Sequence, residues 1–122
     1  MSLIRIIGTG IAASFLLCSS TVAKAALYDG NKLVSDMKAW EQWESSRSDD
    51  ITLLTGFGVY LGYVTAVADS SDVEYCIGDG ITARQLTSVV AKYLHEHPAE
   101  WNKPAFGLVR AALRQAFCKR EK

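Results

Sequence analysis

The stretch from Thr82 to Pro98, TARQLTSVVAKYLHEHP, contains the start, the buried face and the end of a helix. It opens with a capping box, in which Thr82 is followed three residues later by Gln85. Apolar residues then recur with helical spacing at Leu86, Val89, Val90, Tyr93 and Leu94. Pro98 disfavours helical backbone in His97, so the helix is predicted to end there.

The same spacing of apolar residues predicts three more helices, two before this segment and one after it. The first covers residues 31–45, and the second follows a polar break in which Asp49 or Asp50 is the cap. The last begins near Pro104, because proline is favoured in the first turn of a helix. No strand pattern competes with these segments, so the predicted fold is a small all-α domain of four helices.

The second of these helices, residues 51–68, carries no charged residue over eighteen positions. Although that length is just sufficient to span a bilayer, the threonines, tyrosines and glycines of the segment favour the buried central helix of a globular domain. Gly58 and Gly62 are four residues apart and therefore lie on one helix face. Small residues there let another helix approach closely, either within the subunit or across a dimer.

The first 25 residues have the order of a secretory signal peptide. Arg5 precedes an uncharged, mostly apolar run over residues 6–17, and small residues then end in Ala23-Lys24-Ala25. We expect cleavage after Ala25, with Ala23 as the alternative, and export of the chain. The mature part, residues 26–122, suffices for one small domain and is too short for a two-domain enzyme.

Removal of the signal peptide leaves two cysteines, Cys76 and Cys118. An even number of cysteines in an exported chain indicates a disulfide, and two buried free thiols are the alternative. Cys18, within the removed segment, offers a lipoprotein interpretation. Leu17 argues against it, because small residues usually precede a lipidated cysteine.

Acidic and basic residues are distributed unevenly along the mature chain. Residues 29–79 contain ten acidic and three basic side chains, whereas residues 80–122 contain three acidic and eight basic ones. The two halves either form faces of opposite sign or pack together and neutralise each other. The formal net charge of the whole chain is +0, so binding to nucleic acid has no electrostatic support.

Sequence motifs of catalysis and of cofactor binding are absent. The chain has no Gly-x-Ser-x-Gly, no phosphate-binding loop and no zinc signature. His95 and His97 are two residues apart and point in different directions from a helix, so they are poor joint metal ligands. The sequence therefore predicts a binding protein, without cofactor or metal, and not an enzyme.

Short stretches between residues 62 and 118 match the pattern of one known family. They are Gly62-Tyr63-Val64, Val67-Ala68-Asp69, Tyr75-Cys76, Gly80-Ile81-Thr82, Gln85-Leu86, Val89-Val90, Lys92-Tyr93-Leu94, His97-Pro98, Pro104-Ala105, Leu108-Val109, Ala112-Leu113 and Phe117-Cys118. In these stretches the chain resembles the Rap/Tai family of periplasmic immunity proteins, which neutralise peptidoglycan amidase toxins delivered by type VI secretion. The resemblance implies an all-helical fold, a disulfide between Cys76 and Cys118, frequent homodimers, and inhibition by direct occlusion of a papain-like Cys/His amidase.

A small periplasmic chaperone of the acid-stress type is the alternative function. Such proteins are also short, helical and disulfide-bonded, and they expose apolar surface when acid dissociates their dimers. A chaperone should protect unrelated client proteins at low pH, whereas an immunity protein should bind one toxin.

The loop over residues 69–80 is the expected toxin-facing element. Its candidate contact residues are Asp72, Glu74, Tyr75 and Asp79. The carboxylates suit a basic rim around an amidase cleft, and the tyrosine is an aromatic of the kind that anchors interfaces. A solvated connector whose tyrosine packs inward is the alternative for this loop. The turn over residues 95–103, with Trp101, is the rival contact element.

Overall fold

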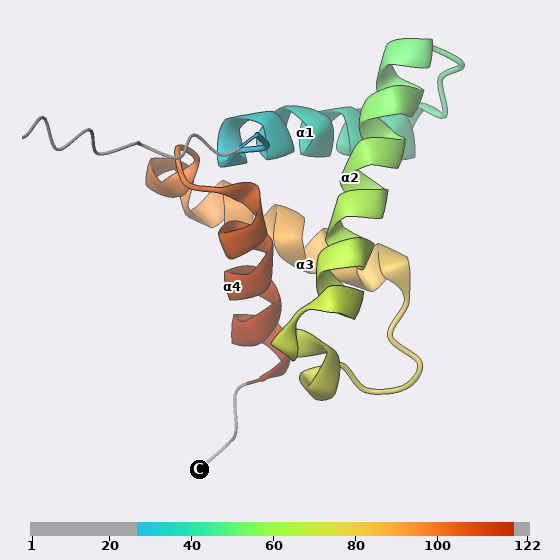
Figure 1. Cartoon of the computed structure of the whole chain (residues 1–122). Coiled ribbons are helices and arrows are strands. Elements are labelled where there is room, and N and C mark those ends of the chain that lie inside the picture. Colours follow the sequence, from blue (N-terminus) through green and yellow to red (C-terminus); the bar gives the residue numbers. More distant parts are fainter. Residues whose placement is uncertain (1–26, 119–122) are drawn as a thin grey trace, which may run out of the picture.

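The computed structural model describes residues 27–118, which form four α-helices and two short 3-10 helices (Figure 1). In chain order these are α1 (Gly30–Ser46), α2 (Ile51–Ser70), η1 (Asp72–Cys76), α3 (Ala83–Glu96), η2 (Pro98–Glu100) and α4 (Ala105–Phe117). The predicted all-α class and its four helices are confirmed. The expected signal peptide, with cleavage after Ala25 or Ala23, lies outside the described residues, as does the lipidation alternative at Cys18.

The helices begin at the residues that the capping signals indicate. Asp50 caps α2, because its Oδ1 accepts a hydrogen bond from the backbone N–H of Thr52 at 2.8 Å. The capping box of α3 is complete: Thr82 Oγ1 accepts from the Gln85 N–H at 3.2 Å, and Gln85 Oε1 accepts from the Thr82 N–H at 2.7 Å. Pro104 stands just before α4, as its N-cap residue, and not inside the first turn.

The segment expected as one loop, residues 69–80, is only partly irregular. Helix α2 continues to Ser70, and η1 adds a short 3-10 helix before the chain becomes irregular. Val73 is the reason for this extra element, because its side chain is fully buried in the core and draws the chain back onto the helices. The expectation of a continuous loop is therefore wrong for its first half.

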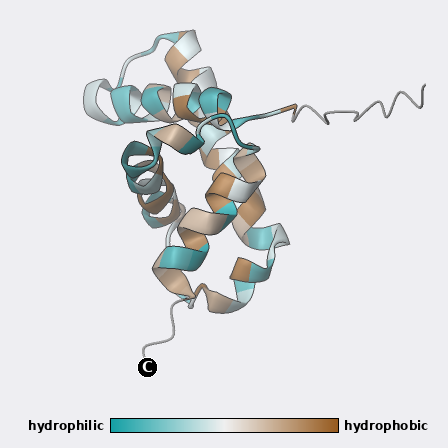
Figure 2. Ribbon diagram, turned by 90° about the vertical axis from the view of Figure 1, so that its left-hand side faces the viewer, coloured by the Kyte–Doolittle hydropathy of each residue, from teal (hydrophilic) through white to brown (hydrophobic). Residues whose placement is uncertain are grey.

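One hydrophobic core lies between the four helices. Its fully buried side chains include Leu33, Met37, Tyr60, Val64, Val73, Val90, Leu94, Val109 and Leu113. Hydrophilic and hydrophobic residues alternate along the helical ribbons, as expected for helices with one buried face (Figure 2). The buried hydroxyl of Tyr60 is satisfied, since it donates a hydrogen bond of 2.6 Å to the backbone oxygen of Thr87 and so joins α2 to α3.

Helix α2 contacts α1, α3 and α4, but only one of its faces is buried. The buried residues are Gly56, Tyr60, Val64, Val67 and Ala68. On the opposite side Ile51 is 73% and Val59 42% exposed. Helix α2 is central, as expected. The expectation that it is buried is wrong for the face that carries Ile51 and Val59. By length and composition α2 could also cross a membrane, although its buried face packs against the other helices as in a globular domain.

The glycines that bring chain segments close together are not the expected pair. A Cβ atom on Gly58 or Gly62 would have nothing within 4 Å, so these residues pack against no other helix in the described part of the chain. A Cβ on Gly56 would instead lie 2.5 Å from Cβ of Ala39 on α1. Of the two alternatives for Gly58 and Gly62, the structure therefore does not support close packing within the subunit, because a spacing of four residues defines a face but not its neighbour, and packing across a dimer stays a prediction.

The acidic and basic halves of the chain pack together. Glu44 of α1 pairs with Arg84 of α3 at 3.1 Å, and Glu41 contacts His95 at 2.7 Å. A third ion pair joins Asp72 of η1 to Arg110 of α4 at 2.6 Å. The interpretation in which the two halves neutralise each other is therefore confirmed at these contacts.

Candidate partner-contact surface

The disulfide between Cys76 and Cys118 joins the end of η1 to the end of α4. The two Cα atoms are 5.1 Å apart, and the bond links positions separated by 42 residues. This confirms the predicted pair and excludes two free thiols at these positions. The bond also fastens the short segment before Cys76 to the body of the domain, where the chain otherwise leaves the core.

Asp72, at the start of η1, is bound by two arginines of α4. Arg110 donates from Nε to Oδ1 at 2.6 Å and from Nη2 to Oδ2 at 2.8 Å, and Arg114 donates from Nη1 to Oδ2. The hydrogen bonds from Arg110, together with the charges of both arginines, lower the pKa of Asp72, while the same carboxylate raises the pKa of Arg110. Both oxygens of the carboxylate are therefore used inside the chain, whereas the sequence suggested that they face a partner.

Glu74 and Tyr75 lie between the buried Val73 and the disulfide-bonded Cys76, and both are exposed. The side chain of Tyr75 is 90% exposed, although the neighbouring Val73 is fully buried. The alternative in which Tyr75 packs inward is therefore wrong. A large exposed aromatic residue on a held segment is typical of a binding anchor, because it offers apolar area at a small cost in conformational entropy.

Asp79 follows in the irregular segment that leads to α3, and it is exposed like Glu74. Gly80 next to it has a φ of 85°, which a residue without Cβ adopts without steric cost. Neither carboxylate forms an ion pair with a residue in the described part of the chain. We call Glu74, Tyr75 and Asp79 the acidic tip, an aromatic side chain accompanied by two carboxylates open to a basic partner.

Trp101, the rival contact residue, lies at the other end of α4. That helix has thirteen residues, so its two ends are about 20 Å apart. The indole is half-buried, its Nε1 donates to the backbone oxygen of Leu94 at 2.8 Å, and Lys38 Nζ lies 5.5 Å from the ring centroid. These contacts lie within the domain. Trp101 and the acidic tip lie at opposite ends of α4, so the two do not form one surface.

The described domain matches the model of one known family. The model of the Rap1a immunity proteins matches residues 29–118, which is nearly the whole described domain. This chain belongs to the Rap1a immunity protein family. No curated protein and no solved structure matches it. As a member of an immunity protein family, the chain is not an enzyme and acts by binding a cognate toxin.

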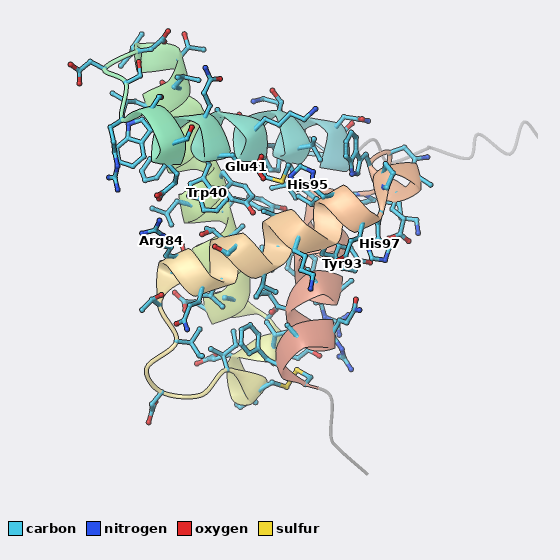
Figure 3. The ribbon with its side chains drawn as sticks, turned by 180° about the vertical axis from the view of Figure 1, so that it is seen from behind. Trp40, Glu41, Arg84, Tyr93, His95 and His97 are labelled. Carbon is cyan, nitrogen blue, oxygen red and sulfur yellow. A yellow bond between two sulfur atoms is a disulfide. The ribbon has the colours of Figure 1, made fainter. Side chains whose placement is uncertain are left out.

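The histidines of this Rap1a family protein make structural contacts. His95 Nε2 lies 2.7 Å from Glu41 Oε1 between α3 and α1, as Figure 3 shows. His97 Nδ1 lies 2.7 Å from the backbone oxygen of Tyr93, and the two rings are stacked with centroids 4.0 Å apart. Within residues 27–118 no group of three or more metal-ligating side chains comes together.

A shallow hollow along the seam of α3 and α4 was not indicated by the sequence. It has a volume of about 250 Å³ and is lined by Val89, Lys92, Tyr93, Glu96, Ala112, Gln115 and Ala116. The hollow exists because the side chains of α4 that line it are small. Helical periodicity shows which face of α4 carries these residues, but not that the face borders a hollow. The hollow could have been predicted from the small Ala112 and Ala116 on α4, if they had been compared with the larger Val89 and Tyr93 on α3.

Proposed function

We propose that this Rap1a family protein protects the producing cell by binding and occluding a peptidoglycan amidase toxin delivered by type VI secretion. The match to the immunity family over residues 29–118 is the observation that carries this proposal. Occlusion needs no chemistry from the inhibitor, which suits a chain without a catalytic set. The disulfide suits the oxidising periplasm, where such a toxin would meet its target.

The membership in an immunity protein family argues against the alternative function, which was a small acid-stress chaperone. No specific feature of the described domain favours a chaperone. We propose that the one cognate partner is an amidase with a papain-like Cys/His centre, as the sequence resemblance implies.

We propose the acidic tip as the part of the surface that enters or covers the amidase cleft. Tyr75 supplies the apolar anchor, while Glu74 and Asp79 meet a basic rim around the cleft. Asp72 is removed from this contact set, since its carboxylate already binds Arg110 and Arg114. Trp101 remains the rival anchor, in a contact element at the opposite end of α4.

The experiment measures binding to each secreted Cys/His amidase that the producing strain encodes, by calorimetry and by inhibition of peptidoglycan cleavage. Glu74→Lys with Asp79→Lys should weaken binding by more than about 2 kcal/mol. The difference from wild type should shrink with added salt, because exposed charges are screened. Tyr75→Ala should cause a loss of similar size that salt does not change.

Asp49→Lys is the matched control for these variants. Asp49 is exposed and forms no ion pair with any described residue, but it lies in the turn between α1 and α2. The control should bind like the wild type. If the acidic-tip variants also bind unchanged, the contact moves to Trp101, and if the wild type binds no amidase, the proposed function is wrong.

We further propose that the protein forms a homodimer through the exposed face of α2. Ile51 and Val59 leave apolar area open on this face, and Gly58 and Gly62 add space for a second helix. Gly62→Glu should then yield a monomer in light scattering, because it places a charge in the contact. Gly107→Glu, at an exposed glycine of α4, is the control and should keep the mass of the wild type.

A further inference from the structure

The acidic tip stands on an element that is weak by itself. Helix η1 has only five residues, and 3-10 helices have poorer hydrogen-bond geometry than α-helices. At its two ends, Glu74 N–H donates to the oxygen of Ser71 at 3.2 Å, and Ile77 N–H donates to that of Val73 at 3.1 Å. The conformation that exposes Glu74 and Tyr75 therefore depends on attachments to the rest of the domain.

Three attachments hold η1, and each involves a different kind of interaction. Val73 is buried in the core, Cys76 is bonded to Cys118, and Asp72 is bound by arginines of α4. Glu74 and Tyr75 are the two residues of η1 without such an attachment, and both are exposed. Because Asp72, Val73 and Cys76 are held in place, they determine the direction in which the side chains of Glu74 and Tyr75 point.

The arginine attachment is the one with the most defined geometry. Arg110 grips both carboxylate oxygens with its planar guanidinium, and Arg114, one helical turn further along α4, adds a contact to Oδ2. A two-point grip of this kind restricts both the position and the rotation of Asp72. The pKa of Asp72 is lowered by these contacts, so the carboxylate is ionised at neutral pH.

We infer that Arg110 and Arg114 are positioning residues for toxin binding: they hold Asp72, and thereby η1, in the conformation that presents Glu74 and Tyr75. This inference rests on the proposed function of the acidic tip. The arginines need not touch the toxin. Without them η1 must be ordered during association, and the entropy lost in that step lowers the affinity.

The binding test uses Asp72→Asn, Arg110→Gln with Arg114→Gln, and the triple variant, with the secreted Cys/His amidase that the wild type binds as the probe. Each set should weaken binding about tenfold, the loss expected when a short segment is ordered only on binding. The triple variant should bind no worse than the arginine double variant, because all three residues act through one contact. Additive losses would show that Asp72 or the arginines contact the toxin directly, and would overturn the inference.

Hydrogen exchange gives a readout that needs no partner. In the arginine double variant the amides of Glu74 and Ile77 should exchange at least about fivefold faster, while amides in the core of α3 keep their protection. Lys92→Gln is the control, because it removes an ion pair with Glu96 on the surface of α3, away from η1. Unchanged exchange of both η1 amides in the double variant would overturn the inference.

Arg110→Lys covers the case in which the double variant fails to fold. Lysine keeps the charge but lacks the planar fork. Exchange in η1 should therefore rise in this variant as well, while its melting temperature stays near that of the wild type. If the wild type binds no amidase, the proposed function fails, and the exchange measurements still decide whether the arginines hold η1.

Discussion

Gly30 and Gly62 differ in what surrounds them, although both lie in helices. A Cβ atom on Gly30 would lie 2.5 Å from the backbone oxygen of Trp101 and 2.5 Å from a methyl group of Leu108. The backbone of the turn before α4 cannot yield as the end of a long side chain would. The same atom on Gly62 would meet nothing within 4 Å.

We predict opposite effects when each of these glycines is replaced by alanine. Gly30→Ala should lower the free energy of unfolding by about 2 kcal/mol, because the added methyl group forces backbone atoms apart. At protein concentrations where the chain is a monomer, Gly62→Ala should raise it by about 0.5 kcal/mol, because alanine loses less conformational entropy than glycine in a helix. Urea denaturation measures both, and equal destabilisation by the two substitutions would contradict this account.

At the scale of elements, α3 is the helix with the most complete local signals. Both reciprocal hydrogen bonds of its capping box are present, between Thr82 and Gln85. Its apolar face packs against α2 and α4. Local capping and tertiary packing therefore favour the same start for this helix.

Thr82→Ala should lower the free energy of unfolding by about 1 kcal/mol, because it removes the acceptor for one of the free N–H groups at the start of α3. Thr82→Ser keeps the hydroxyl oxygen and should restore most of this loss. Both values come from denaturant unfolding followed by circular dichroism. A serine variant as unstable as the alanine variant would contradict a capping role.

The attachment of η1 to α4 should depend on pH. Arg110 and Arg114 lower the pKa of Asp72, so the ionised carboxylate is favoured in the folded state. Its contribution is complete above the ordinary pKa of aspartate, near 4, and is lost as the pH falls through the lowered value. The wild type should therefore be more stable than Asp72→Asn at neutral pH, and the difference should vanish in acid.

The control for this pH dependence is Asp72→Asn made in the Arg110→Gln, Arg114→Gln background. Without the arginines the substitution should change stability little at any pH. Urea unfolding measured from neutral pH down to about pH 2 covers the range in which aspartate protonates. A pH-independent difference between wild type and Asp72→Asn would contradict the assignment.

At the scale of the molecule, the disulfide between Cys76 and Cys118 closes a covalent loop in the described domain. It joins positions 42 residues apart and so constrains the unfolded chain, a stabilisation of about 4 kcal/mol in the chain-entropy model. Small exported domains depend strongly on such bonds, since their cores are limited. The bond also fastens the element that carries the acidic tip.

Cys76→Ser with Cys118→Ser should lower the melting temperature by more than about 10 °C, given the entropy of unfolding of a domain of this size. Reducing agent should lower the melting temperature of the wild type in the same way and leave the double variant unchanged. Thermal unfolding followed by circular dichroism provides the values. A wild type insensitive to reductant at its melting temperature would argue against a stabilising bond.

The sequence by itself determined the helical class, the cap at Thr82 and the cysteine pair, and it left Asp49 and Asp50 as alternative caps of the second helix. Caps and helical period act over a few neighbouring residues, and the two cysteines after residue 26 leave one pairing between them. These features can be predicted because the interactions that cause them are local or have only one solution.

Only the tertiary structure decided which glycine admits a neighbouring helix, where Asp72 directs its carboxylate and whether Tyr75 faces solvent. Gly56 meets α1 while Gly58 does not, and Asp72 binds arginines 38 and 42 positions away. Such contacts depend on how the helices cross, and helical spacing records only which residues share a face. The acidic tip was therefore predictable as a segment, while the orientation of each of its side chains required the packed domain.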